Sequence, residues 1–219
     1  MAEAVTVNRA APGEIRHPMV EQLSQLWRNK TAVAGLIIIT MFVLMAIFAP
    51  LLAPHDPLET SLYDQLKPPV WHEGGSTKNI LGTDDLGRDT LSRIIYGSRV
   101  SLIVAVFSVG LAFTVGTLLG CLSGYYKGPV DSAIMRVMDM ILAFPYLLLA
   151  IVVVAYLGPS LQNAMMAIAI TYVPRFARIV RGSVLEEGEK DYVMAARSIG
   201  AGDIRIMFIT ILPNCMGPL

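Results

Sequence analysis

Charged residues and cysteines are scarce in this sequence, and each shortage narrows the class of protein. Charged side chains form 16% of the 219 residues and hydrophobic ones 54%, with a mean hydropathy of +0.59, whereas about a quarter of a soluble domain is charged. The 17 basic and 17 acidic residues cancel, so no overall field favours nucleic acid. Cys121 and Cys215 stand in or beside apolar segments and do not indicate a disulfide framework. We therefore expect an integral membrane protein that does not bind nucleic acid.

Motifs for catalysis are also missing. Neither GxGxxG nor GxxxxGK[ST] occurs, so any ATP chemistry must belong to another chain. The serines have no nucleophile-elbow context, and the three histidines are scattered in polar surroundings: His17, His55 and His72. We predict no catalytic residue, no metal and no cofactor.

Long runs with little or no charge predict about four membrane-spanning helices, because about 20 apolar residues cross a bilayer. The predicted spans are 31–54, 100–126, 133–157 and 161–181. Pro145 and Pro174 are expected to kink the last two. Arg175 and Arg178 stand near the end of the fourth span and should extend to the membrane interface.

Residues 1–30 are polar and mixed in charge, so we expect no cleavable signal peptide. The first half is expected to be a disordered leader. Apolar residues at helical spacing then predict a short amphipathic helix in the headgroup region, with Trp27, Arg28 and Lys30 as anchors. The alternative is a simple cytoplasmic extension of the first span.

The polar stretch 55–99 predicts an extramembrane loop. Its acids Asp84, Asp85 and Asp89 lack the spacing of a calcium loop. We instead expect Thr83 or Asp84 to cap a helix over 86–96.

The distribution of basic residues predicts that the N-terminus is cytoplasmic. With that orientation 12 of the 17 basic residues lie inside, and the loop 55–99 carries the other five among seven acids. The inside set is Arg9, Arg16, Arg28, Lys30, Lys127, Arg136, Arg175, Arg178, Arg181, Lys190, Arg197 and Arg205.

Small residues recur every four positions along the second span. Such a stripe allows another helix to approach closely. It consists of Ser108, Ala112, Gly116, Gly120 and Gly124.

Arg136 and Asp139 lie one helical turn apart at the inner end of the third span. We expect an ion pair at the interface. The alternative is a contact with the following hairpin or with a partner permease.

Residues 186–213 predict a cytoplasmic hairpin of two short helices. Gly200 and Gly202 break the first helix, because glycine tolerates positive φ. Asp203 is expected to cap a second helix over 204–212 that Pro213 stops or kinks. The first helix has an apolar stripe with Arg197 outside it: Tyr192, Val193, Ala196 and Ile199. Such a hairpin could insert into a groove of a partner.

Several motifs resemble one known family, the permease subunits of bacterial ATP-binding-cassette importers. The hairpin is similar to their EAA-loop signature at Ala195, Ala196, Gly200, Ile211, Leu212 and Pro213. The strings LGTDDLGRDTLSRIIYGSRVSL, MRVMD and AFPYLLLA are similar to the dipeptide, oligopeptide and nickel subfamily. One departure is Met194, where the family usually has glutamate.

The resemblance implies a type I importer permease fold in a bacterial inner membrane. It implies that two ATPase subunits, a second homologous permease and an extracytoplasmic solute-binding protein are partners. It also implies further spans, so that 214–219 would begin the next one. The coupling residues would be Asp191, Tyr192, Ala195, Ala196, Gly200, Ala201, Gly202, Ile211, Leu212 and Pro213. The alternative function is a self-sufficient channel or an ion-coupled transporter, although no span carries a central acid or histidine for ion coupling.

Overall fold

The computed structural model describes residues 29–217. The predicted leader and most of the amphipathic helix in 1–30 fall outside this range, as do the last two residues of 214–219. The described residues form helices and two isolated bridges, with no strand among them. They divide into two compact units, one ending at Arg99 and one beginning at Val100.

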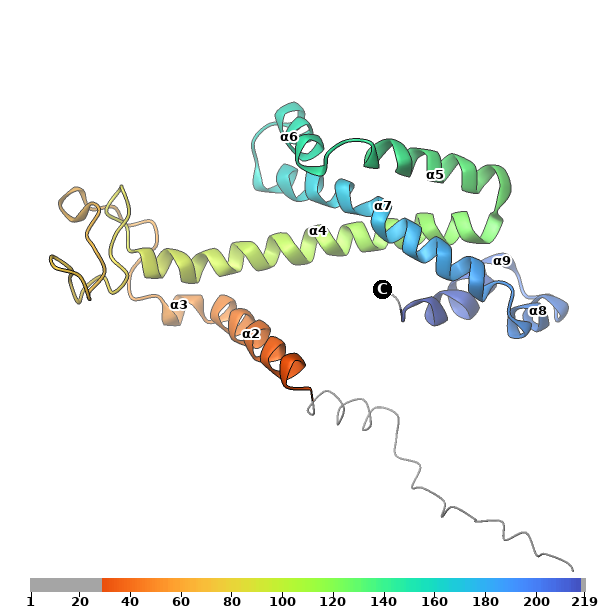
Figure 1. Ribbon diagram of the computed structural model, residues 1–219, viewed down its shortest axis with the longest axis horizontal. Coiled ribbons are helices and arrows are strands. Elements are labelled where there is room, and N and C mark those ends of the chain that lie inside the picture. Colours follow the sequence, from red (N-terminus) through yellow and green to blue (C-terminus); the bar gives the residue numbers. More distant parts are fainter. Residues whose placement is uncertain (1–28, 218–219) are drawn as a thin grey trace, which may run out of the picture. The chain divides into compact units, whose positions relative to one another are not determined.

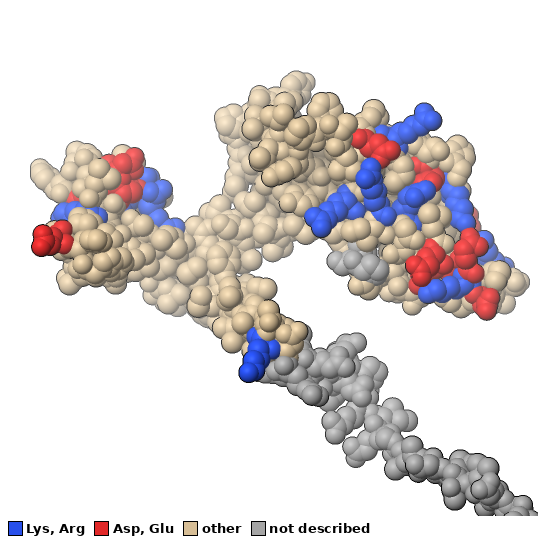
Figure 2. Space-filling view, in the orientation of Figure 1, with Lys and Arg blue, Asp and Glu red and all other residues tan. Residues whose placement is uncertain are grey.

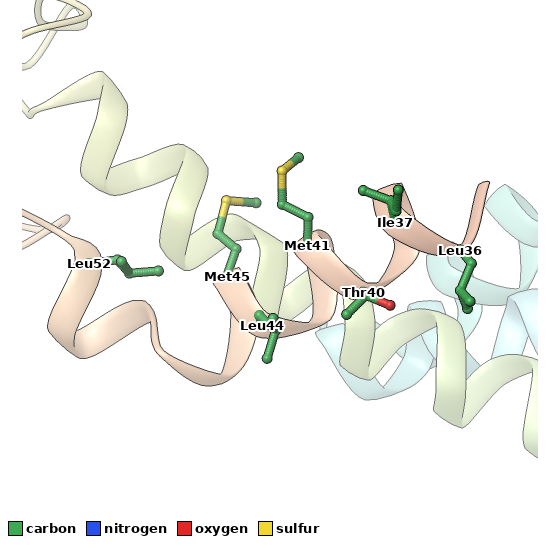
Figure 3. Close-up of a pocket in the computed structure, with 7 residues that line it drawn as sticks. All are labelled: Leu36, Ile37, Thr40, Met41, Leu44, Met45 and Leu52. Carbon is green, nitrogen blue, oxygen red and sulfur yellow. The ribbon is translucent and has the colours of Figure 1, made fainter. Parts of the chain in front are cut away.

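The first unit begins with α2 (Lys30–Ile47) and the short α3 (Ala49–Leu52). The Asn29 side chain caps α2 by accepting hydrogen bonds from the backbone N–H groups of Thr31 and Ala32. Most of the large apolar side chains of α2 are exposed. Figure 3 shows some of them projecting from the two helices around a hollow whose lining is hydrocarbon and thioether except for Thr40. This surface suits contact with lipid.

Backbone hydrogen bonds between segments distant in sequence hold the loop after α3 together. The loop contains one short 3-10 turn, η1 (Leu62–Asp64). Ser61 N–H bonds to Leu86 O at 3.2 Å, and Leu66 N–H bonds to Asp84 O at 3.0 Å. Gly87 has φ +73°, and a Cβ there would lie 1.9 Å from Ser61 O. The backbones at Gly87 and Ser61 therefore pack so closely that only glycine fits at position 87.

The helix predicted over 86–96 begins later, at Thr90, and continues as α4 (Thr90–Tyr126). Asp89 makes the capping contact, because its side chain accepts from Ser92 N–H at 2.8 Å. Asp84 instead accepts from Leu86 N–H and Arg88 N–H, both at 2.9 Å. That turn includes positive φ at Gly87, which an α-helix does not permit. The predicted boundary between loop and span at Arg99 thus lies within one continuous helix.

The second unit holds the rest of α4 together with α5 (Gly128–Leu142), α6 (Tyr146–Leu157) and α7 (Leu161–Glu187). Helices α5 and α6 both pack against α7 and lie along successive parts of it (Figure 1). The segment predicted as one kinked span over 133–157 is bent by 91° between them. Pro145 lies at the bend with extended backbone angles, because its ring prevents the helix from continuing. By contrast, α7 continues through Pro174.

Two described helices, α2 and α4, are long and apolar enough to cross a membrane, and the bent pair α5–α6 would make a third. Helix α7 has 27 residues, but charged side chains occupy its second half. Four spans therefore stay a prediction.

The small-residue stripe of α4 faces α7. A Cβ on Gly116 would lie 2.9 Å from Val173 O, and one on Gly124 would lie 2.9 Å from Arg181 O. Ser108 Oγ donates to Met165 O at 3.1 Å, and Ala112 is fully buried. These contacts bring the two backbones close enough for apolar side chains of α7 to fill the space beside α4.

Candidate functional site

The hairpin begins with α8 (Asp191–Ser198), which ends in a regular glycine motif. Gly200 has φ +80°. Its N–H bonds to Arg197 O at 2.9 Å, and Ala201 N–H bonds to Ala196 O at 3.1 Å. This pair of hydrogen bonds is the Schellman arrangement, which reverses the chain and satisfies the last carbonyl groups of the helix.

The return segment is helical but not a uniform α-helix, contrary to the helix predicted over 204–212. It consists of α9 (Asp203–Arg205), the π-helix η2 (Ile206–Ile211) and the 3-10 turn η3 (Leu212–Cys215). Leu212 N–H bonds to Met207 O, five residues back. Pro213 has no N–H to offer the oxygen of Ile209, so α-helical bonding cannot continue there. Pro213 thus interrupts regular α-helical bonding, although the chain continues as a 3-10 turn to Cys215.

The base of the hairpin is buried against the C-terminal ends of α4 and α7. Val193 from α8 and Ile206 and Ile211 from the return segment are at most 1% exposed. They form one apolar cluster with Cys121, Val180, Val184, Met207 and Cys215, and partly buried Ala196 and Ala201 pack against it. The hairpin is thereby fixed to two long helices.

Polar contacts also attach the hairpin to the end of α4. Lys127 Nζ lies 2.6 Å from Glu189 Oε1, just before α8. Tyr125 donates its hydroxyl to Asp203 at 2.7 Å, and the Arg197 guanidinium lies 5.6 Å from the Tyr125 ring centroid. Asp203 was expected to cap the return helix, but Gly202 is the N-cap residue and no side chain caps it. These contacts with Tyr125 and Lys127 were not predicted from the sequence. Their only signal in the sequence is that charged residues stand near both ends of the hairpin.

A second polar cluster joins the end of α7 to the start of α8. Lys190 Nζ lies 2.6 Å from Glu187 Oε1, and the Tyr192 hydroxyl donates to the other Glu187 oxygen. The hydrogen bonds from Lys190 and Tyr192 lower the pKa of Glu187. Burial and the Glu187 carboxylate raise the pKa of Tyr192 to about 12, so its hydroxyl stays a donor at neutral pH.

The remaining predicted hairpin residues lie at its surface or turns. Asp191 and Ala195 are exposed on α8, Leu212 is partly buried, and Pro213 is exposed. Of the predicted apolar stripe only Val193 is fully buried, while Ile199 is 86% exposed. Ile204 is 73% exposed on the other side of the reversal. The hairpin thus has two isoleucines exposed on either side of its turn, and Met194 of α8 is half exposed.

Asp139 pairs with Arg178 of α7 rather than with Arg136. Its Oδ1 lies 2.5 Å from the Arg178 guanidinium. Within residues 29–217 Arg136 makes no ion pair, although it lines a groove between α5 and α7 together with Asp139 and Arg178. Arg178 of α7 thus binds the carboxylate that Arg136, three residues earlier on α5, was expected to bind.

Comparisons with known proteins identify the family of the chain. Residues 116–219 match the family model of the binding-protein-dependent transport system inner membrane component. Residues 18–69 match the N-terminal TM domain of oligopeptide transport permease C.

Named relatives cover most of the chain. It is 48% identical to a dipeptide transport system permease protein of Haemophilus influenzae over 90% of this chain and 68% of the relative. It is 47% identical to that of Escherichia coli K12, over 98% of this chain and 72% of the relative. A glutathione transport system permease protein of Pectobacterium atrosepticum is 41% identical over 94% of this chain and 66% of its own length. The chain therefore belongs to the inner-membrane permease components of binding-protein-dependent ABC importers, in the dipeptide and oligopeptide subfamily.

Proposed function

We propose that the chain forms half of the translocation pathway of an ATP-driven importer of dipeptides, oligopeptides or related small solutes. The names of the relatives support the substrate class, since they include dipeptide, di/tripeptide and glutathione permeases. A second homologous permease forms the other half. Two ATPase subunits hydrolyse ATP, and an extracytoplasmic binding protein delivers the solute.

The hairpin is the coupling element of this proposal. The observation that carries it is the contrast between a fully buried base and a tip with Ile199 and Ile204 exposed. Exposed apolar side chains on a short rigid helix suit a groove in a partner protein. Because the base packs on α4 and α7, movement of the tip is transmitted to helices that line or support the pathway. This placement requires the hairpin, and with it the N-terminus, to be cytoplasmic.

Uptake of labelled dipeptides into proteoliposomes containing the complete transporter tests this function. We expect uptake only with the binding protein present and ATP on the side of the ATPases. Accumulation driven by an ion gradient after the ATPase subunits are omitted would instead support the channel or secondary-transporter alternative.

Cross-linking tests the hairpin separately. A photoreactive amino acid at Ile204 should attach to an ATPase subunit, while the same group at Leu62 in the loop before α4 should not. Equal labelling from both positions would remove the hairpin from the coupling role without affecting the substrate assignment.

A further inference from the structure

A groove between α5 and α7 is lined by charged side chains that the coupling role does not use. It encloses about 500 Å³. Three arginines line it, one from α5 and two from α7, together with two aspartates and Ser132. Basic and acidic side chains gather over this part of the chain in Figure 2, whereas the surface of α6 shows none in that view.

One arginine of the groove is already fixed. The Arg181 guanidinium binds Asp131 through two parallel contacts, at 2.5 Å and 2.6 Å. Ser123 donates a further hydrogen bond to the same carboxylate. Asp131 is thus well satisfied, and this pair forms one rigid wall of the groove.

The other two arginines are available to an anion. Arg178 has a single contact with Asp139, and both side chains are at least half exposed, at 51% and 60%. Such an exposed pair is weak and can be rearranged by a stronger ligand. Arg136 is exposed and without an ion pair in the part of the chain that the structure describes. With three arginines against two aspartates, the groove has a net charge of about +1.

Exposed apolar side chains of α5 lie next to the groove. Met140 lies one turn after Arg136 on the same helical face and is 60% exposed, and neighbouring Val137 is 46% exposed. A basic site next to an exposed apolar helix face, in a membrane protein, matches a ligand with a phosphate and an acyl chain. A free phosphate would use only the arginines.

We propose that this groove binds the phosphate headgroup of an anionic phospholipid. Arg136 and Arg178 donate to the phosphate oxygens, Ser132 offers its hydroxyl, and Arg181 stays with Asp131. The acyl chains lie along Val137 and Met140. The site holds α5 against α7 from the membrane side.

Native mass spectrometry of the complete transporter in nanodiscs tests the site. The discs contain phosphatidylcholine alone or phosphatidylcholine mixed with phosphatidylglycerol, and the bound phosphatidylglycerol is counted after release into detergent. Arg136→Gln should reduce its retention about fivefold, the factor expected for one arginine at a lipid headgroup. Arg99→Gln removes the same charge from α4, outside the groove, and should leave retention unchanged. Arg136→Lys keeps the charge but not the guanidinium, so its retention of phosphatidylglycerol should lie between those of Arg136→Gln and Arg99→Gln.

Ser132→Leu provides an uncharged second variant, because it narrows the groove without altering its arginines. It should also lower retention, and it keeps the test usable if Arg136→Gln lowers the yield of folded protein. Equal retention by Arg136→Gln and Arg99→Gln would overturn the proposal. Displacement of the lipid by excess inorganic phosphate, with phosphate itself retained, would show a free-anion site and overturn the assignment to lipid.

Discussion

Gly120 of α4 and Ala177 of α7 approach each other so closely that no side chain fits between them. A Cβ on Gly120 would lie 2.5 Å from Ala177 O, far inside van der Waals contact. The obstacle is a backbone atom within a helix, so it cannot move aside as a flexible side chain could.

Gly120→Ala should therefore lower the free energy of unfolding by about 2 kcal/mol, as overpacking does. Gly110→Ala is the matched control, since it lies in the same helix with nothing within 4 Å of the added Cβ. Thermal unfolding of the purified permease in detergent compares the two. Because alanine has the higher helix propensity, Gly110→Ala should be neutral or slightly stabilising. Equal destabilisation by the two substitutions would contradict close packing at Gly120 as the cause.

Gly200→Ala tests the reversal of the hairpin. Nothing lies within 4 Å of the added Cβ, so the expected cost is about 1 kcal/mol of strain from φ +80° alone. Because this strain distorts the tip, solute-stimulated ATP hydrolysis should fall while membrane insertion persists. Gly202→Ala adds a Cβ in open space without positive φ and should retain stimulation. Full stimulation in Gly200→Ala would argue against a geometrically fixed tip.

Asp131→Asn and Asp139→Asn should differ in their effects. Asp131 is 19% exposed and accepts from Arg181 and Ser123, so losing its charge should cost about 2 kcal/mol. The Asp139 pair is exposed, and its loss should cost less than about 1 kcal/mol. Chemical unfolding in mixed micelles measures both. Equal losses would mean that exposure does not set the strength of these pairs.

The loop before α4 should resist acid because of Asp84. Burial raises the pKa of this carboxyl, but hydrogen bonds from the Arg88 N–H, the Arg88 guanidinium and the Leu86 N–H outweigh that effect and hold the pKa at about 2. Since the folded pKa lies below the ordinary value of 3.8, the ionised carboxylate stabilises the loop above about pH 4. That contribution is lost as the pH falls towards 2.

Protease protection of the loop, measured from pH 5 to pH 2 with an acid protease, checks this expectation. Protection should decline across about pH 4 to 2 in the parent protein. Asp84→Asn should be less protected at pH 5 and should lose part of that pH dependence. The remainder belongs to Asp64 and Asp89 of the same loop, whose pKa values are also lowered. Asp85 is the neighbouring carboxylate and its side chain is exposed, so Asp85→Asn is the control and should behave like the parent protein.

Sequence periodicity located the helices better than it located the polar contacts. The four-residue spacing that ends at Gly124 marks a helix face, and that face does lie on α7. The partners of Asp139 and Asp203 could not be read from the sequence, because each lies on another helix: Arg178 and Tyr125. Spacing along the chain instead predicts Arg136 as the partner of Asp139 and a helix-capping role for Asp203. Likewise, Pro145 predicts an interruption, but the 91° bend depends on how α5 and α6 pack against α7.

Co-purification of the ATPase subunits with hairpin variants tests the central claim most directly. Ile199→Asp places a charge on the exposed tip without disturbing the buried base, and Leu62→Asp makes the same change in the loop before α4. We expect Ile199→Asp to lose the ATPase subunits and solute-stimulated ATP hydrolysis, whereas Leu62→Asp should keep both. Normal co-purification and stimulation in Ile199→Asp would contradict coupling through this hairpin.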